Sequence, residues 1–279
     1  MKAFVLTYHA HHCLGPDYAV NDHVALPIDL AAITRAGHRI VSLDTLIDRL
    51  TTGFDDGAAP TSVALTFDDG PIYDIDDFLH PALGWQRGFV GAMQDFAATA
   101  LGARQPGLVA TSFVIASPDA RRVMETTFDA EYTFLGAGSM GDEWWERAAA
   151  TGLLGIGNHS WDHLHPALPR VAHSRQVRAD FGQVLSVADA DAQIRDAATF
   201  IAQRTGGKSV PFFAYPFGQC NAFLTSDYLP RHGDAAGVRA AFTTEPRSVR
   251  NDDSRWRMPR LTCGHHWKTP GELIALLAA

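Results

Sequence analysis

Short apolar stretches alternate along this chain with segments whose apolar positions recur every three or four residues. The apolar stretches are rich in β-branched and aromatic residues and predict strands, whereas the recurring spacing predicts helices. The expected strands are Ala3–Tyr8, Arg39–Leu43, Ser62–Phe67, Val109–Ala116, Leu153–Gly157, Val210–Tyr215, Ala240–Thr243 and Pro259–Leu261. The expected helices are Pro27–Ala36, Asp44–Leu50, Gly88–Leu101, Gly141–Thr151, Asp189–Thr205 and Pro270–Leu277. Such alternation is typical of an α/β fold, with parallel strands joined by helices.

The segment Asp189–Thr205 carries the clearest helical pattern. Its apolar positions recur at the spacing of a helix face and are Ala190, Ile194, Ala197, Ala198 and Ile201. Two connections, Asp74–Arg87 and Pro166–Ala188, interrupt the alternation. Connections this long inside a compact domain usually carry function or disorder.

The length of the chain and its lack of linker-like segments favour one large domain. Its 279 residues lie near the roughly 250 residues of a single barrel of alternating strands and helices. The sequence contains no internal repeat, low-complexity tract or linker that would divide it. We therefore expect residues 1–279 to form a single domain.

Charge and hydropathy exclude several classes of protein. The 23 Lys and Arg against 31 Asp and Glu give a net charge of −8, and the pI is about 5.9. This balance, with no cluster of basic residues, argues against a nucleic acid or an anionic membrane as the main partner. No stretch approaches the roughly 18 consecutive apolar residues of a membrane helix. The oligomeric state stays open.

Cysteine usage and the amino terminus bear on the cellular compartment. The three cysteines, Cys13, Cys220 and Cys263, are too few and too irregularly spaced for a disulfide framework or a zinc knuckle. The opening MKAFVLTYHAHH has one Lys and an apolar run that meets two histidines at once, shorter than a secretory signal requires. A cytoplasmic location is expected, although a secreted chain trimmed of its leader would look the same.

Candidate chemistry begins at SVALTFDDGP, residues 62–71. Alternating apolar residues predict a strand, and the carboxylates Asp68 and Asp69 fall where that strand ends, before Gly70. Adjacent carboxylates at a strand end point to different sides, so one can hold a metal while the other handles a proton. Asp-Asp-Gly alone is equally typical of an ordinary turn.

A second polar cluster, GNHSWDHLHP at residues 157–166, follows another apolar stretch. His159 and His163 are four residues apart, which places both imidazoles on one side of a helical turn. Thirteen histidines in the chain mean that such a pair can also arise in a solvated loop. Two histidines and Asp69, however, would leave a coordination position of Zn²⁺ open for water, as in a catalytic zinc site.

These segments resemble the polysaccharide deacetylases, the NodB-homology family of carbohydrate esterases. The resemblance rests on TFDDG at Thr66–Gly70, His-Ser-x-x-His at His159–His163 and, in part, FAYPFG at Phe213–Gly218, and it extends over roughly Lys2 to Leu261. It implies a distorted (β/α)7 barrel that removes acetyl groups from N-acetylated sugars with one divalent cation. Zinc is the expected ion, and other first-row divalent ions also suit such ligands.

The resemblance also assigns roles to residues of the first two motifs. Asp69, His159 and His163 would be the metal ligands, and Asp68 the general base that takes a proton from the attacking water. Ser160 would support its loop by hydrogen bonding, unless it is an ordinary loop serine.

The third motif departs from the family pattern. Ala214 stands where the family usually has an arginine that orients the base, while Pro216, Phe217 and Gly218 keep the backbone that would donate an N–H to the developing oxyanion. Arg260, in MPRL, resembles the arginine of relatives that lack the usual one. We therefore expect either that Arg260 replaces it or that Arg260 is a surface residue paired with an acid.

The proton donor for the leaving amine is expected to be a histidine. Most family members use a Leu-x-His near the carboxyl end, which this sequence lacks. His9 follows the first apolar strand, an arrangement similar to the circularly permuted branch of the family. We expect His9 to be the acid, with His265 as the alternative, and we take His11 and His12 as ordinary histidines.

Aromatic residues and one thiol are less informative. Trp144 and Trp145 are expected in the core, whereas Trp161, with Phe217, could line a sugar-binding cleft. Cys220 has no activating base at a fixed spacing and is expected to be a buried thiol.

Three functions remain open from the sequence. The first is a metal-dependent deacetylase acting on an N-acetylated saccharide or related small molecule. The second is an amide or cyclic-imide hydrolase acting on a small non-carbohydrate compound, because one fold supports many substrates. The third is a catalytically silent carbohydrate-binding relative, against which the intact Asp68, Asp69, His159 and His163 count.

Overall fold

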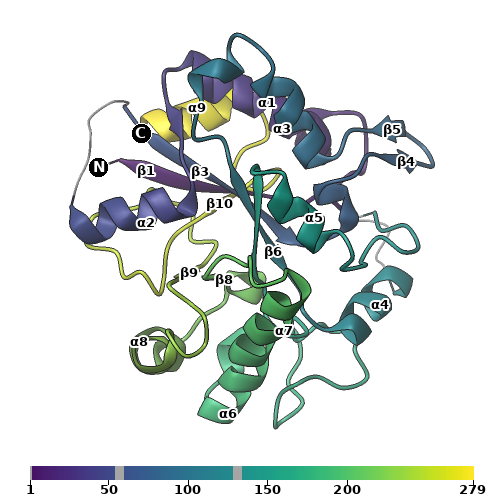
Figure 1. Ribbon diagram of the computed structural model, residues 1–279, viewed down its shortest axis with the longest axis vertical. Coiled ribbons are helices and arrows are strands. Elements are labelled where there is room, and N and C mark those ends of the chain that lie inside the picture. Colours follow the sequence, from purple (N-terminus) through teal and green to yellow (C-terminus); the bar gives the residue numbers. More distant parts are fainter. Residues whose placement is uncertain (1, 54–59, 128–133) are drawn as a thin grey trace.

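The computed structural model describes residues 2–53, 60–127 and 134–279, and its centre is a curled parallel sheet surrounded by helices (Figure 1). The strands run in the order β10-β1-β3-β6-β7-β8-β9, and β2 pairs with β3 beside this path. Their bounds are β1 Ala3–Tyr8, β2 Arg39–Ile40, β3 Ser62–Asp69, β6 Ala110–Val114, β7 Leu154–Asn158, β8 Phe212–Ala214, β9 Ala240–Phe242 and β10 Leu261–Thr262. Every pairing in this sheet is parallel. The predicted α/β fold is thereby confirmed.

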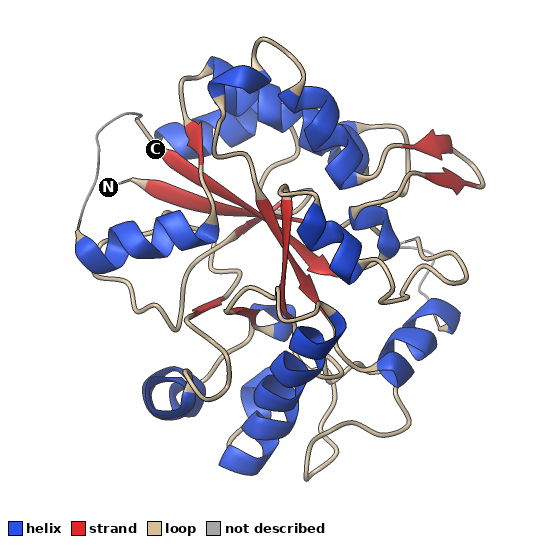
Figure 2. Ribbon diagram, viewed as in Figure 1, coloured by secondary structure: helices blue, strands red, loops and turns tan. Residues whose placement is uncertain are grey.

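Helices follow most of the strands and lie around the sheet (Figure 2). Their bounds are α1 Asp22–Arg35, α2 Leu43–Thr52, α3 Phe89–Ala97, α4 Pro118–Thr126, α5 Trp145–Ala150, α6 Val187–Ala190, α7 Asp196–Arg204, α8 Leu229–His232 and α9 Pro270–Ala278. A π-helical segment, Asp191–Arg195, joins α6 to α7, so the predicted helix Asp189–Thr205 is one nearly continuous helical stretch. No helix among the described residues is long and apolar enough to span a membrane.

The strands at the centre are apolar throughout because both faces of the sheet are covered. In β1, alternate side chains belong to two different clusters. Phe4 and Leu6 pack with residues of α1, α3 and α9, whereas Ala3 and Val5 pack on the other face with residues of α2. This two-sided burial explains why the first and third strands appear in the sequence as nearly unbroken apolar runs.

The segment before β10 lies between the two ends of the strand order. Met258 pairs with Phe242 of β9, and Leu261 pairs with Leu6 of β1. The chain from Met258 to Thr262 therefore crosses from β9, at one end of the strand order, to β10, which lies at the other end beside β1. This path carries Arg260 into the interior, where it is fully buried.

Several element boundaries differ from the sequence predictions. Helix α1 begins at Asp22, five residues before the predicted start at Pro27, because the side chain of Asn21 caps it by accepting a hydrogen bond from the His23 N–H. The connection Asp74–Arg87 contains a hairpin of β4 (Phe78–His80) and β5 (Gly84–Gln86). Helix α4 was not predicted.

The turn after β3 places strict demands on its backbone. Asp69 and Gly70 both have left-handed φ values, 73° and 72°. A Cβ on Gly70 would lie 2.5 Å from a methyl carbon of Val114. Only glycine avoids both the conformational strain and this clash.

Gly70→Ala is expected to destabilise the protein by roughly 2–4 kcal/mol, as the sum of left-handed strain and overpacking. Gly37→Ala is a matched control, because Gly37 has a φ of 83° and no described atom within 4 Å of the added Cβ. The control should lose only about 1 kcal/mol. Urea unfolding measures both, and equal losses would contradict a contribution from Val114.

Candidate functional site

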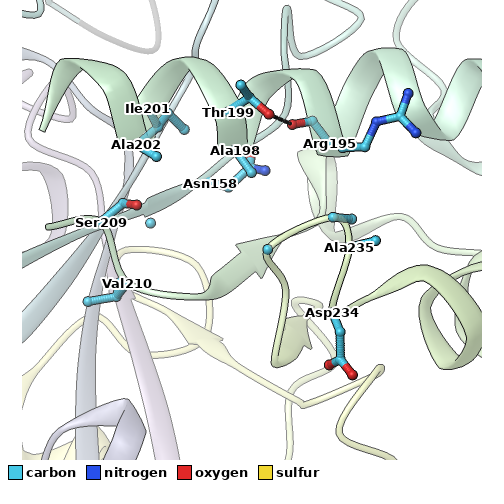
Figure 3. Close-up of a pocket in the computed structure, with 13 residues that line it drawn as sticks. Asn158, Arg195, Ala198, Thr199, Ile201, Ala202, Ser209, Val210, Asp234 and Ala235 are labelled. Atoms are coloured by element: carbon cyan, nitrogen blue, oxygen red, sulfur yellow. Dashed lines mark hydrogen bonds between the residues drawn. The ribbon is translucent and has the colours of Figure 1, made fainter. Parts of the chain in front are cut away.

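Two cavities among the described residues differ in their chemistry. One, of about 250 Å³, lies beside α7 and is lined mostly by small side chains, and its charged residues Arg195 and Asp234 extend in different directions (Figure 3). The other, of about 550 Å³, is lined by Asp69, His163 and Phe217 among others. Only the larger cavity joins the groups that the sequence singled out, so it contains the candidate site.

The two sequence motifs meet at the carboxyl edge of the sheet. Asp68 and Asp69 are the last residues of β3, and His159 directly follows β7. Strand β6 lies between β3 and β7 and pairs with both. The carboxyl ends of these parallel strands lie at one edge of the sheet, where loops of barrel enzymes carry catalytic groups.

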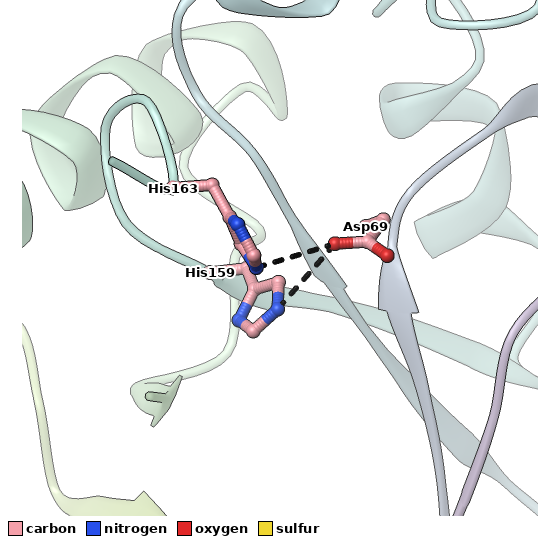
Figure 4. Close-up of side chains that lie close together, drawn as sticks. All are labelled: Asp69, His159 and His163. Carbon is pink, nitrogen blue, oxygen red and sulfur yellow. Dashed lines mark ion pairs between the residues drawn. The ribbon is translucent and has the colours of Figure 1, made fainter. Parts of the chain in front are cut away.

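Asp69, His159 and His163 form a cluster that fits a metal ion. Their ligand atoms lie within 4.8 Å of one another, and both histidines point toward the carboxylate (Figure 4). Oδ1 of Asp69 is 3.5 Å from Nε2 of His159 and 3.7 Å from Nε2 of His163. The same oxygen is buried and has no hydrogen-bond partner among the residues that the structure describes. A cation would satisfy this oxygen, and two imidazoles with one carboxylate are a common donor set for zinc.

Hydrogen bonds orient both histidines. Nδ1 of His159 lies 2.8 Å from the Ala214 carbonyl oxygen and donates to it, which leaves Nε2 as the ligand atom. The Ser160 hydroxyl accepts the His163 N–H at 2.9 Å, and the Asn158 side chain accepts the Ser160 N–H at 2.8 Å. Ser160 and His163 have left-handed φ values. These bonds hold a strained loop in place.

The pKa values of the cluster suit metal binding. Burial, together with the neighbouring His159, lowers the pKa of His163 to about 3. Burial raises the pKa of Asp69, but the nearby His11 and His163 outweigh burial and bring the pKa well below its ordinary range. A carboxylate and a neutral imidazole are the protonation states that bind a cation.

Asp68 forms a buried ion pair with Arg260. Two nitrogens of the guanidinium lie 2.7 and 2.8 Å from the two carboxylate oxygens. The guanidinium also donates to Thr66 and to the Thr243 carbonyl. Burial raises the pKa of Asp68, but the Arg260 charge outweighs it, and the resulting pKa lies below the ordinary value. Arg260 is therefore buried and paired with Asp68, and the expectation of a surface arginine is wrong.

The candidate acids differ in where they lie. His9 follows β1, close enough to Asp68 and Asp69 to lower the pKa of both carboxyls. Its backbone N–H donates to Asp22 at 2.7 Å. His265 is exposed, and its ring packs against His266. Of the two candidates, His9 is the one that these interactions connect to the site.

Sequence reasoning missed His11. Its Nε2 lies 3.6 Å from Oδ2 of Asp69, the oxygen that does not face His159 and His163. His11 lines the larger cavity, and burial lowers its pKa to about 4. Its neighbour His12 pairs with Asp22 at 2.8 Å. If the alternation of β1 is continued beyond the strand, His9 and His11 fall on the same side of the chain, and this could have drawn attention to both.

Phe217 lies at the mouth of the site. Its φ is 57°, so its backbone is strained, and its side chain is 42% exposed. The ring centroid is 4.3 Å from that of His163 in an edge-on contact. Strain of this kind concentrates at functional positions.

The remaining aromatic and thiol predictions have mixed outcomes. Trp144 and Trp145 are fully buried in the core, as expected. Trp161 is partly buried against that core and packs on Phe200, and it does not line the larger cavity. Cys220 is partly buried, and burial raises the pKa of its thiol.

Asp74 is a second residue that the sequence did not reveal. It is fully buried, and its Oδ2 accepts a hydrogen bond from the Ser112 hydroxyl at 2.6 Å while Oδ1 has no partner. Burial, with a smaller contribution from Asp69 and Asp68, raises its pKa well above the ordinary value. Burial therefore favours the protonated form of Asp74, beside Asp68 and Asp69.

The chain belongs to the polysaccharide deacetylase family, whose model, described as "Polysaccharide deacetylase", matches residues 55–228. No curated protein sequence matches the chain closely enough to be counted.

Solved structures of other proteins share this fold. A deacetylase, PplD, from Streptococcus pyogenes, solved in complex with acetate, is 15% identical with a TM-score of 0.63, over 99% of this chain and 98% of that one. IcaB from Ammonifex degensii is 18% identical with a TM-score of 0.63, over 100% and 97% of the two chains. A de-N-acetylase from Aggregatibacter actinomycetemcomitans is 15% identical with a TM-score of 0.57, over 94% of each chain. The fold is that of a NodB-like (β/α)7 barrel.

Asp74 provides a test of the site's electrostatics. The unfolded chain releases this proton above about pH 4, whereas the folded chain keeps it, so the unfolded state binds fewer protons and the free energy of unfolding falls as pH rises. Asp74→Asn removes this loss. Relative to wild type, the variant should gain up to about 1.4 kcal/mol per pH unit above pH 4, until the folded protein also ionises.

Urea unfolding of the metal-free protein at pH 5 and pH 7 measures this difference. Asp119→Asn, at an aspartate 85% exposed in its side chain, is the control and should follow wild type at both values. A stability difference between Asp74→Asn and wild type that is the same at both pH values would contradict a buried neutral carboxyl.

Proposed function

We propose that this protein is a divalent-metal-dependent hydrolase that removes N-acetyl groups from a carbohydrate or a sugar-containing compound. The observation that carries the proposal is the convergence of Asp69, His159 and His163 beside the ion pair of Asp68 and Arg260. Family membership supports the reaction class. The acetate complex of the Streptococcus pyogenes deacetylase, a chain of similar fold, supports the acyl group.

Asp69, His159 and His163 would hold the cation, and Zn²⁺ suits this donor set best. When bound, a divalent cation supplies a Lewis acid that polarises the acetamide carbonyl and makes water more acidic. The protein's part is to hold the ligands in their binding forms. The bond from the His159 ring to the Ala214 carbonyl fixes the ligand form of that ring, and the bond from the His163 backbone N–H to Ser160 fixes the loop that carries His163.

Asp68 would act as the general base. It removes a proton from the attacking water only while it is ionised, and the Arg260 pair keeps it ionised despite complete burial. The pair also fixes the carboxylate, because a guanidinium binds both of its oxygens at once. Oδ2 of Asp68 remains 3.9 Å from Nε2 of His159, so the base lies beside the cation site.

The other two steps fall to Phe217 and His9. The Phe217 backbone N–H would donate to the oxygen that gains charge as water attacks the acetamide. His9 would give a proton to the amine as it leaves, and its position near Asp68 and Asp69 supports this role.

A substrate panel tests the reaction. Metal-loaded protein is expected to release acetate from N-acetylglucosamine oligomers or nucleotide sugars, and His159→Ala is expected to lose both the metal and the activity. Acetate by enzymatic assay and metal by elemental analysis are the measurements. Ring-opened acid from a cyclic imide without acetate release would favour the amide hydrolase instead. Bound metal without any hydrolysis would indicate a silent binding protein.

Arg260→Met tests the base. Without the guanidinium, only His159 and His9 still oppose the effect of burial, so the pKa of Asp68 rises. We expect kcat for acetate release to fall by roughly 10²–10⁴-fold, with metal content unchanged. Asp68→Asn should lose a similar factor. Breaking a buried pair also destabilises by about 3–5 kcal/mol, so thermal unfolding of each variant accompanies the assay.

Arg239→Met is the control, because Arg239 pairs with Asp44 and Asp48 of α2. It should keep wild-type turnover. If Arg260→Met is folded and also keeps wild-type turnover, Arg260 has no part in the reaction.

A further inference from the structure

The cavity beside the metal ligands has a largely apolar wall. Its apolar lining comes from four parts of the chain, namely α4, the segment 135–140, the loop after His163 and the turn Pro216–Gly218 after β8. The apolar side chains are Met124, Leu135, Met140, Pro166, Ala167 and Phe217. At about 550 Å³ the cavity is in the range of roughly 300–1,000 Å³ that encloses drug-sized ligands. An acetyl group would fill a small part of it.

This wall is fixed in place by side chains of α4. Arg121 donates to the Met140 carbonyl at 2.8 Å, and Glu125 accepts the Met140 N–H at 2.6 Å. Arg121 is itself buried, pairs with Asp142 at 2.7 Å and lies over the ring of Trp145. Both backbone groups of Met140 are therefore held by the helix that carries Met124. The cavity is preformed on this side.

Among the lining residues that the structure describes, few side chains outside the metal ligands can hydrogen-bond a sugar hydroxyl. They are His11, Thr127 and His165. Nδ1 of His165 accepts the Ala167 N–H at 3.3 Å, so in the neutral ring Nε2 carries the proton and donates. A site for several unmodified sugar units would need many more such groups, because each buried hydroxyl costs free energy unless it is paired.

We propose that this cavity binds an apolar group carried by the sugar of the substrate, such as an aryl or alkyl aglycone. The proposal rests on the deacetylase function above, in which the acyl group is only an acetyl. The remaining volume then belongs to the side of the leaving amine. Met124 and Met140 determine specificity, because their flexible thioethers pack well against aromatic and alkyl groups.

Binding to the metal-free protein tests the proposal separately from catalysis. The probes are 4-methylumbelliferyl and methyl N-acetyl-β-D-glucosaminide, titrated by calorimetry. The aryl glycoside is expected to bind roughly tenfold or more tightly than the methyl glycoside, as apolar contacts of this size allow. Equal binding of the two glycosides would overturn the proposal. Tighter binding of methyl N-hexanoylglucosaminide than of the aryl glycoside would also overturn it, because the cavity would then bind the acyl group and not the aglycone.

Variants at Met124 locate the effect. Met124→Gln keeps the length of the side chain but places an amide in the wall, and it should abolish the preference for the aryl glycoside. Met124→Leu should retain the preference, and Arg122→Gln, at an exposed residue of the same helix, should match wild type. Thermal unfolding shows whether each variant folds. A preference that survives in folded Met124→Gln would overturn the proposal.

Acetate release distinguishes the two proposals. Release from both glycosides without an aryl preference in kcat/KM would overturn the apolar-group proposal and leave the deacetylase function standing. Aryl preference in binding with no acetate from any glycoside by the metal-loaded protein would overturn the deacetylase function and, with it, the assignment of this group to a deacetylase substrate.

Discussion

The site depends on keeping one buried carboxylate, Asp68, ionised. Asp68 and Arg260 are both buried, and removing either charge from water alone would cost several kcal/mol. Each charge offsets the cost of burying the other. The two-point contact and the further bonds from Arg260 to Thr66 and Thr243 satisfy most of the polar atoms of the two side chains. The segment that crosses from β9 to β1 also carries Arg260. The closure of the barrel and the position of this arginine beside Asp68 therefore depend on the same stretch of chain.

Residues that follow strands were the part of the site that sequence could reveal. Asp68 and Asp69 end β3, and His159 follows β7. In a parallel sheet such positions share an edge, so an apolar run followed by a metal-binding residue type carries three-dimensional information. Arg260 precedes β10 and does not follow a strand, so this rule did not point to it, and the family resemblance suggested both the residue and its partner.

The residues that sequence did not reveal act through packing between distant segments. His11 looked like one of several histidines until the fold brought β1 beside β3 and placed it against Asp69. Asp74 lies in a connection for which the sequence showed only an unusual length, and the rise in its pKa follows from burial. Local pattern also failed for α1, where the Asn21 cap outweighed the expectation that Pro27 begins a helix.

The ion partner of Asp68 has a consequence for the timing of biosynthesis. Asp68 and Arg260 are 192 positions apart in the chain, so a growing polypeptide holds the carboxylate long before its arginine has been made. Domains of this size emerge from the ribosome amino terminus first. Until β10 enters the sheet, Asp68 has no guanidinium beside it, so its side chain is more stable protonated or exposed to water than buried as an ion. The Asp68–Arg260 pair should therefore form late in folding, with the final closure of the barrel.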